Sequence, residues 1–508
     1  MLSETTPDPL PAPPAAFNMA AHVLHRADAL GNKVALAVLT LGRAERWSFA
    51  RLKAAVLGTG AGFLARGLAP GDRVLLRLGN RVEYPIAYLG AIAVGLVPIP
   101  SSPQLTEREV EGVIEITDPK LILREDGIAC PATDAPQMEL ADLQSLQDLP
   151  PAPFHFGDPD RPAYIVFTSG TSGTPRAVVH AHRAILGRQM MMADWYDLRE
   201  SDRLCHAGAF NWTYTMGTGL MDPWTMGATA LIPGPEVDIA LLPLLLKRHD
   251  ATILAAAPGV YRKLLGAGVA MNLPKLRHGL CAGEKLSETI RDGWRAAAGT
   301  ELYEAYGMSE CSTFISGAPA RPAPHAALGF AQTGRRVAIL GSDGPVPLGK
   351  EGTIAVHRSD PGLMLGYLGE EAATAERMQG DWFLTGDQAV MGADGAITFL
   401  GRSDDMMNAG GYRVSPMEVE AVLNAHPDIG QAAVTDIEVK ADARVIMAFY
   451  TASAPIAEET LKDFASARLA GYKCPRAFYH VQELPAGANG KLTRRALRPI
   501  YETLHGKA

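Results

Sequence analysis

Apolar residues in the first third of the chain alternate between a helical and a strand-like pattern. Between residues 50 and 68, Leu52, Val56 and Phe63 recur at helical spacing and predict a helix with one buried face. Short apolar runs follow and are predicted to be strands, at residues 74–76, 92–94 and 121–123. This alternation predicts helices layered against a largely parallel β-sheet, the arrangement typical of α/β proteins.

After Gly329 the pattern changes to short apolar runs separated by turn residues. Closely spaced strands and turns of this kind predict a small, barrel-like β-subdomain attached to the layered sheets. The predicted strands of this subdomain are residues 336–340, 352–356 and 396–399.

The C-terminal part of the chain returns to a mixed pattern after a polar break at residues 402–405. A chain of 508 residues is too long for one compact core, so at least two domains are expected. We expect an α/β protein with a large N-terminal domain, residues 1–401, and a small, mobile α+β C-terminal domain, residues 402–508, with the hinge near 402–405. The predicted elements of the small domain are helices at 416–425 and 458–469 and a strand at 431–434.

Charge and composition narrow the functional classes. The net charge of −8 at pH 7 argues against non-specific binding to nucleic acid or to anionic membranes. The five cysteines are scattered and lack C-x-x-C spacing, so we expect reduced thiols rather than disulfides or a zinc site. The first 18 residues lack the pattern of a signal peptide, and the most apolar run, 86–97, is too short to cross a bilayer. We therefore expect a cytoplasmic protein without a membrane or nucleic-acid partner.

The most informative motif is the run Phe-Thr-Ser-Gly-Thr-Ser-Gly-Thr-Pro-Arg at residues 167–176, which follows a predicted buried strand at 163–166. Such a loop can surround an anion with backbone N–H groups, because glycine adopts positive φ angles and has no side chain. Taken alone, the run is also typical of a flexible surface turn. A Walker A loop is excluded because the G-x-x-x-x-G-K-[ST] pattern is absent.

Four further motifs follow the loop in a fixed order. They are Tyr-Gly-Met-Ser-Glu at 306–310, Thr-Gly-Asp at 385–387, the segment from Gly-Arg-Ser-Asp-Asp at 401–405 to Gly-Gly-Tyr-Arg at 410–413, and Pro-Ala-Gly-Ala-Asn-Gly-Lys at 485–491. This ordered set resembles the adenylate-forming superfamily, which includes acyl-CoA synthetases, adenylation domains of peptide synthetases and luciferases. The resemblance extends from residue 47 to residue 495.

The resemblance implies a two-step reaction with ATP, Mg²⁺ and coenzyme A. A carboxylate attacks the α-phosphate of ATP and releases pyrophosphate, and a thiol then takes the acyl group from the adenylate. Negative charge develops on phosphate oxygens, so the site needs positioned donors, cations and a metal ion. The residues implied to bind the nucleotide are Thr168, Ser169, Gly170, Thr171, Ser172, Gly173, Thr174, Arg176, Gly283, Glu284, Glu304, Ala305, Tyr306, Gly307, Ser309, Asp387 and Arg402.

Individual roles follow from these positions. Tyr306 is implied to stack on adenine, while Gly283 and Glu284 border the other side of the base. Asp387 suits the ribose hydroxyls, because a fixed carboxylate accepts strong hydrogen bonds. Glu310 is a catalytic residue and the candidate Mg²⁺ ligand, since Mg²⁺ is often held by one carboxylate plus phosphate oxygens. A carboxylate at a helix start is the alternative interpretation of Glu310.

Lys491 is the first candidate for catalysis, and Arg402 is a second. A lysine on a tight Asn-Gly-Lys turn can present a point charge to the α-phosphate and the carboxylate. In the family, the C-terminal domain delivers this lysine for adenylation and then rotates for thiolation, about the hinge position occupied here by Asp404. In the rotated state Gly410 and Gly411 are implied to line the tunnel for the pantetheine of CoA.

Two positions depart from the family pattern. The loop usually ends in Pro-Lys-Gly, but here Arg176 and Ala177 follow the proline. Arginine keeps the charge and changes the donor geometry. Ser309 stands where threonine is common, and either hydroxyl can bond a phosphate oxygen.

The acid is expected to bind against the segment 205–214. Amino-acid-activating relatives place an aspartate in this segment, but residues 204–221 contain no acidic residue, which argues against an amino-acid substrate. Gly307 replaces the tryptophan that limits the pocket of acetyl-CoA synthetases, so we expect room beyond two carbons. Three aromatic residues are either pocket walls or ordinary core residues: Phe210, Trp212 and Tyr214.

We therefore expect an ATP-dependent, AMP-forming acid–CoA ligase for an aromatic, alicyclic or short- to medium-chain carboxylic acid, most similar to benzoate and medium-chain synthetases. An adenylating enzyme that serves a carrier-protein pantetheine and a non-catalytic adenylate-binding homologue are the alternatives. The motif ending at Lys491 also fits reversible acetylation by a protein lysine acetyltransferase, which would remove the catalytic charge. The sequence leaves the exact acid and the oligomeric state open.

Overall fold

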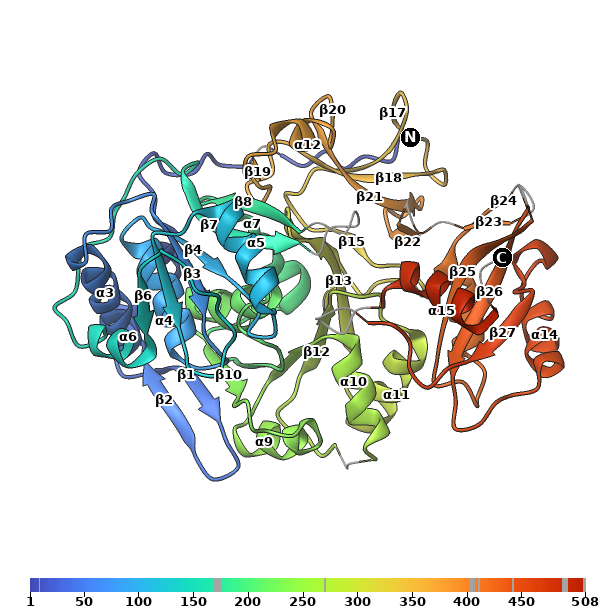
Figure 1. Ribbon diagram of the computed structural model, residues 1–508, viewed down its shortest axis with the longest axis horizontal. Helices are drawn as coiled ribbons and strands as arrows, with labels where there is room; N and C mark the ends of the chain where they lie inside the picture. Colours follow the sequence, from blue (N-terminus) through green and yellow to red (C-terminus); the bar gives the residue numbers. More distant parts are fainter. Residues whose placement is uncertain are drawn as a thin grey trace.

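The computed structural model describes residues 1–8, 10–168, 175–268, 271–402, 405, 407–409, 412–440, 443–486 and 492–505. A large α/β body (blue to green), a β-subdomain (yellow to orange) and a C-terminal α+β unit (red) are visible in Figure 1. This confirms the predicted fold class, whereas the exact boundary at 402–405 stays a prediction. The predicted site residues outside the described ranges are Ser169, Gly170, Thr171, Ser172, Gly173, Thr174, Asp404, Gly410, Gly411 and Lys491.

The largest sheet has nine strands, and the run from β13 to β1 across its centre is parallel throughout. Most residues of these strands are apolar and buried, as expected for parallel strands covered on both faces. The predicted largely parallel sheet is confirmed. In spatial order its strands are β15 (Phe330–Ala331), β14 (Ser312–Ser316), β13 (Leu302–Met308), β12 (His278–Ala282), β11 (Ile253–Ala256), β9 (Arg203–His206), β10 (Thr229–Pro233), β1 (Val34–Leu39) and β2 (Ala44–Ser48).

Short helices connect the strands of this sheet. The π-helix η2 and helix α8 follow one another directly and lead from β9 to β10. Helix α11 begins after Ser287, whose hydroxyl accepts a hydrogen bond from the Ile290 N–H. The helices are η2 (Thr215–Met221), α8 (Asp222–Met226), η3 (Ile239–Leu241), α9 (Leu242–Arg248), α10 (Pro258–Gly266) and α11 (Glu288–Ala298).

A second layer combines a parallel four-stranded sheet with an antiparallel three-stranded one. Residues Leu75, Ile99 and Ile165 belong to one buried cluster that joins the two sheets. The four-stranded sheet is β4 (Val97–Pro100), β3 (Arg73–Arg77), β5 (Leu121–Arg124) and β6 (Gln137–Glu139), and the other is β19 (Gly366–Tyr367), β8 (Arg176–Ala181) and β7 (Pro162–Thr168). Further helices of the N-terminal part of the chain are α2 (Ala27–Leu30), α5 (Glu107–Thr117), α6 (Leu140–Leu146), α7 (Ala184–Met191) and the π-helix η1 (Met192–Tyr196).

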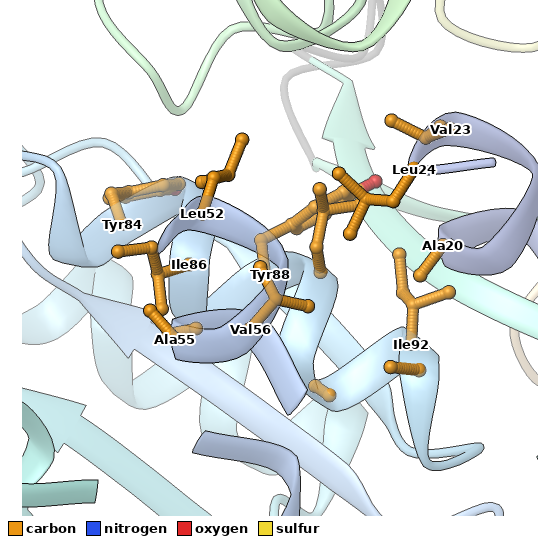
Figure 2. Close-up of a cluster of buried hydrophobic side chains, with 14 of the residues drawn as sticks. Ala20, Val23, Leu24, Leu52, Ala55, Val56, Tyr84, Ile86, Tyr88 and Ile92 are labelled. Atoms are coloured by element: carbon orange, nitrogen blue, oxygen red, sulfur yellow. The ribbon is translucent and has the colours of Figure 1, made fainter. Parts of the chain in front are cut away.

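Helices α1 (Met19–Val23), α3 (Phe49–Ala65) and α4 (Glu83–Ala93) bury a common apolar cluster, part of which Figure 2 shows. The predicted helix at 50–68 is confirmed as α3, and Leu52 and Val56 are fully buried, as their spacing predicts. A Cβ on Gly90 would lie 2.9 Å from the Val56 carbonyl oxygen, so this glycine allows the close approach of α3 and α4.

The predicted strand at 92–94 is wrong. These residues form the end of α4 and the turn after it, and the strand is β4. Residues 84–100 are buried on every side, so their apolar pattern has no period that distinguishes a helix from a strand. Gly95, with φ of +86°, forms the turn between the two elements.

The β-subdomain and the C-terminal unit agree with the predicted patterns. The three strands predicted after Gly329 are β16, β18 and β22, and the helices and strand predicted after residue 405 are α13, α14 and β25. The subdomain contains β16 (Val337–Gly341), β17 (Gly344–Pro345), β18 (Glu351–His357), α12 (Glu371–Ala375), β20 (Met378–Gln379), β21 (Trp382–Met391) and β22 (Ile397–Arg402). The C-terminal unit contains β23 (Met407–Ala409), β24 (Tyr412–Val414), α13 (Pro416–Asn424), β25 (Gln431–Lys440), β26 (Ala443–Thr451), α14 (Glu458–Ser466), η4 (Gly471–Lys473), β27 (Ala477–His480), η5 (Arg494–Ala496) and α15 (Leu497–His505).

Further features of the chain are the state of its cysteines and the length of its helices. All five cysteines are free thiols, as their spacing predicts. In the described part of the chain, none of the helices has the length and apolar character needed to span a membrane.

Candidate active site

The phosphate-binding motif joins two neighbouring strand ends. Strand β7 ends at Thr168 and β8 begins at Arg176, and these two residues face each other in the antiparallel pair. The connecting residues 169–174 lie outside the described ranges. Because both flanking residues are paired in the sheet, the loop begins and ends at fixed points.

Arg176 and Glu310 both contact Tyr367. The Tyr367 hydroxyl donates a 2.8 Å hydrogen bond to Glu310 Oε1, and the Arg176 guanidinium lies 5.1 Å from the centre of the Tyr367 ring. Burial and the neighbouring Glu310 carboxylate raise the pKa of Tyr367, so its hydroxyl stays protonated and donates. Arg176 Nε is also 3.4 Å from Glu370 Oε2. Arg176, at the end of the loop predicted to bind phosphate, and the candidate metal ligand Glu310 thus contact the same tyrosine.

Glu310 lies in the turn between β13 and β14, with only 6% of its surface exposed. The turn is followed by a strand, so the alternative interpretation of Glu310 as a helix-start carboxylate is wrong. The backbone N–H of Met364 donates to the Glu310 carbonyl at 2.8 Å and fixes the turn against the segment that leads to β19. Tyr367 had no motif to mark it, because the pairing of β19 with β8 is what brings it here.

The residues predicted to hold adenosine also lie together. The Tyr306 hydroxyl donates to Asp387 Oδ2, and Arg402 Nη1 is 3.6 Å from Asp387 Oδ1. The register of β21 and β22 places Asp387 directly opposite Arg402. The Tyr306 ring packs against Phe314 and Phe399 with centroid distances of 5.3 and 5.8 Å. Asp387 therefore has a fixed position from which it can accept hydrogen bonds from a ribose.

Glu304 has a supporting role next to the adenine loop. Its side chain is almost fully buried, and its two oxygens accept hydrogen bonds from Lys285 Nζ at 2.8 Å and from the Leu286 N–H at 2.9 Å. Both oxygens are thus used within the protein, and the carboxylate fixes the loop that contains Gly283 and Glu284. Ala305, its neighbour in β13, is buried in the sheet.

The three aromatic residues of the segment 205–214 have different surroundings. Phe210 is 1% exposed and packs against Tyr84 in the core, and Tyr214 is buried and donates to the Leu280 carbonyl at 3.2 Å. The burial of these two residues favours the alternative interpretation as core residues, and their role as pocket walls stays a prediction. Trp212 is half-buried and its ring covers Gly283, where a Cβ would lie 2.8 Å from Trp212 Cζ2. Trp212 stays a candidate wall of the acid pocket.

The surroundings of Gly307 suggest a second interpretation beside its predicted role of opening the acid pocket. The pairing of β13 with β14 shifts register between Tyr306 and Gly307. A Cβ at Gly307 would lie 2.1 Å from the Ser312 carbonyl oxygen and 2.4 Å from Thr313 Cα. The glycine therefore allows a close approach of two strands, and a side chain here would meet backbone before it met an acid.

Asp222, the first acidic residue after the acid-binding segment, is not available for a substrate ammonium. Asp222, one residue beyond 204–221, accepts from Arg188 Nε at 2.9 Å and from Arg188 Nη2 at 2.7 Å. It also accepts from the Tyr196 hydroxyl at 2.8 Å. This supports the prediction that amino acids are poor substrates.

Comparisons with known proteins identify the family of the chain. Residues 23–368 match the family described as AMP-binding enzyme, and residues 418–491 match the AMP-binding enzyme C-terminal domain. The chain belongs to the AMP-binding enzyme family. It is 32% identical to the human mitochondrial acyl-coenzyme A synthetase ACSM5, covering 90% of this chain and 84% of that protein, and 29% identical to ACSM3 of Rattus norvegicus with the same coverage.

Two solved structures share the fold over nearly the whole chain. The anthranilate CoA ligase AuaEII, in complex with anthranoyl-AMP, superposes with a TM-score of 0.85 at 25% identity, covering 96% of this chain and 98% of that one. A benzoate CoA ligase from Burkholderia xenovorans LB400 has a TM-score of 0.82 at 25% identity, covering 95% of this chain and all of that one. The resemblance to the adenylate-forming superfamily is thus confirmed.

Proposed function

We propose that the protein is an AMP-forming acid–CoA ligase. A carboxylic acid attacks the α-phosphate of ATP and pyrophosphate leaves, and the CoA thiol then attacks the acyl-adenylate and AMP leaves. The observation that carries the proposal is the contact of Asp387 with both Tyr306 and Arg402, in a chain whose relatives are acyl-CoA synthetases.

Mg²⁺ is part of this proposal, with Glu310 as its protein ligand. Among the described residues, no three His, Cys, Asp or Glu side chains gather as a metal site. A single buried carboxylate fits Mg²⁺, which is often bound by one or two carboxylates together with substrate phosphates and water. When bound, the ion would offset negative charge on the phosphate oxygens.

The remaining residues orient the nucleotide. Asp387 is held between the Tyr306 hydroxyl and Arg402, so it is ordered before a ribose binds. Arg176 is about one third exposed and its partner Glu370 is more exposed still, so the arginine can exchange this carboxylate for a phosphate at low cost. Lys491 is proposed to meet the α-phosphate and the acid carboxylate during adenylation.

The proposed substrates are aromatic, alicyclic or short- to medium-chain carboxylic acids. The similar proteins are named as anthranilate and benzoate CoA ligases and as acyl-coenzyme A synthetases. The pairing of Asp222 with Arg188 disfavours amino acids. These observations support an acid without an α-ammonium group.

The test is a panel of acids assayed for pyrophosphate release with Mg-ATP, first without and then with CoA. Pyrophosphate release together with CoA-dependent AMP and acyl-CoA supports the ligase. Pyrophosphate release followed by transfer of the acyl group to a carrier-protein pantetheine, and not to CoA, supports the first alternative. Absence of pyrophosphate release with every acid would contradict the proposal and favour a non-catalytic homologue.

We also propose that acetylation of Lys491 regulates the enzyme. Acetylation removes the positive charge and adds bulk where the carboxylate and the α-phosphate meet. Incubation with a protein lysine acetyltransferase and acetyl-CoA, followed by mass spectrometry, is expected to locate the modification at Lys491 and to stop adenylation. Modification at other lysines with full activity would show that this residue is only catalytic.

A further inference from the structure

A small cavity with both apolar and polar walls lies beside the segment 306–310. Its volume is about 30 Å³, and its wall includes Met308 and Ser309 of that segment and Asn211 and Thr213 of the acid-binding segment. The cavity therefore touches both parts of the chain that should meet the acid. We term six of its lining residues the polar subsite: Tyr88, Tyr164, His180, Arg188, Ser309 and Ser312.

His180 contributes a buried hydrogen-bond acceptor. Its Nε2 lies 2.7 Å from the Ser309 carbonyl oxygen, which can only accept, so Nε2 carries the proton and donates. Nδ1 is then an acceptor, and it is buried without a hydrogen-bond partner in the described part of the chain. Burial lowers the pKa of His180 to about 4, which keeps the ring neutral at pH 7. A buried polar atom without a partner is costly unless a ligand completes it.

Tyr88 and Tyr164 contribute two donors. Burial raises the pKa of both, so their hydroxyls stay protonated. Within the described residues, neither hydroxyl has a hydrogen-bond partner. The Tyr164 ring stacks on His180 at 4.8 Å and lies 5.9 Å from the Tyr88 ring, so the three side chains are direct neighbours.

The polar subsite is electrically neutral. Arg188 is the only cation among the described lining residues, and Asp222 holds it with two hydrogen bonds of 2.7 and 2.9 Å. Its Nη1 donates to Ser312 Oγ at 2.7 Å. If the substrate carried a second carboxylate, that group would be buried in this cavity without a free counter-charge, which is strongly unfavourable. A neutral group is therefore favoured.

We propose that the polar subsite binds a hydroxyl substituent of the carboxylic acid substrate. A hydroxyl can accept from Tyr88 or Tyr164 and donate to His180 Nδ1, whereas a carbonyl would leave the histidine acceptor unpaired. A cavity needs about 10–15 Å³ to hold one water, so a space of about 30 Å³ admits a group of that size and excludes a ring or a chain. The inference rests on the proposed function and names the acid class as hydroxy acids.

The test compares acids that differ only in this substituent. The full-length enzyme with Mg-ATP is assayed for pyrophosphate release with benzoate, the three hydroxybenzoates, the matching methylbenzoates and terephthalate, and also with butyrate, valerate and the hydroxybutyrates. At least one hydroxy acid is expected to exceed its methyl counterpart by about 10²-fold or more in kcat/KM, because a site built to bond a hydroxyl rejects the analogue that lacks it. Terephthalate is expected to be a poor substrate.

Variants then assign the preference to the cavity. Tyr88→Phe and Tyr164→Phe should each lower kcat/KM for the preferred hydroxy acid about ten- to hundredfold and leave the unsubstituted acid unchanged. Tyr84→Phe is the matched control, because Tyr84 is buried on the same helix as Tyr88, one turn away, and does not line the cavity.

The polar subsite and the proposed function would be contradicted by different results. Adenylation of several acids without a preference for any hydroxy acid would overturn the polar subsite and leave the proposed function intact. The same holds if Tyr88→Phe and Tyr164→Phe slow all acids equally. An enzyme that adenylates no acid in the panel would overturn both.

Discussion

The nucleotide side of the site and the polar subsite are assembled in different ways. On the nucleotide side, the side chains of Tyr306, Asp387 and Arg402 come from motifs, and one strand register places two of them face to face. In the polar subsite, Tyr88 comes from α4 and His180 from β8, elements that belong to different layers of the N-terminal domain. The subsite forms only where those layers pack.

This difference indicates what each region does. Nucleotide contacts depend on a few charged and hydroxyl groups whose chemistry is the same for every acid, and local sequence can encode them. Contacts with the acid depend on volume and on polar atoms contributed by distant elements. Changes on the nucleotide side should therefore affect all acids alike, whereas changes in the polar subsite should affect stability or acid preference.

The largest effect is expected from Arg188→Met. The side chains of Arg188 and Asp222 are 9% and 0% exposed, so the substitution leaves a buried carboxylate without its cation. Breaking a buried pair in this way costs about 3–5 kcal/mol of folding free energy. Urea unfolding should show this loss.

The double variant Arg188→Met/Asp222→Asn is the control for charge. Asparagine keeps an oxygen for the Tyr196 hydroxyl and removes the stranded charge, so most of the lost stability should return. If the single variant loses less than about 1 kcal/mol, Asp222 is not as desolvated as its burial indicates.

Lys491→Ala should have the largest effect on chemistry. Removing one charge that meets the transition state lowers kcat by about 10²- to 10³-fold, and the loss should be similar for every acid. Thiolation from synthetic acyl-AMP should persist, because that step uses the rotated domain. Lys473→Ala is the matched control in the same unit, since Lys473 is paired with Glu418 at 2.6 Å and should matter little. Loss of both half-reactions would contradict the two-state use of the domain.

Gly307→Ala distinguishes the two interpretations of this glycine. The added Cβ would meet the Ser312 carbonyl, so a loss of about 1–3 kcal/mol in stability is expected, without a shift towards shorter acids. Gly259→Ala is the control, because no atom lies within 4 Å of a Cβ at that position. A stable Gly307→Ala enzyme with a preference for acetate would restore the pocket-opening interpretation.

The sequence predicted the elements whose apolar residues are periodic and the residues that belong to a short motif. Leu52 and Val56 on one face of a helix, or Asp387 in the Thr-Gly-Asp motif, are recognisable from local sequence alone. The run 92–94 could not be recognised as the end of a helix, because the apolar pattern of residues that are buried on all sides has no period. The close contacts of Gly307 could not be predicted either, because they are made with backbone atoms of the next strand. Tyr88, on another element of the same domain, had no local feature to mark it at all.

The smallest effect is expected from Arg176→Lys, which restores the residue usual in the family. Arg176 and Glu370 are 30% and 43% exposed, and such partly exposed pairs contribute about 0–1 kcal/mol. The guanidinium also lies over the Tyr367 ring at 5.1 Å, a contact that an ammonium can replace in part. The KM for ATP should change by less than about fivefold, whereas Arg176→Ala, which removes the charge, should raise it about tenfold. Equal and large losses in both variants would show that the fork geometry of arginine is required. An unchanged KM in both would show that the charge at this position does not bind phosphate.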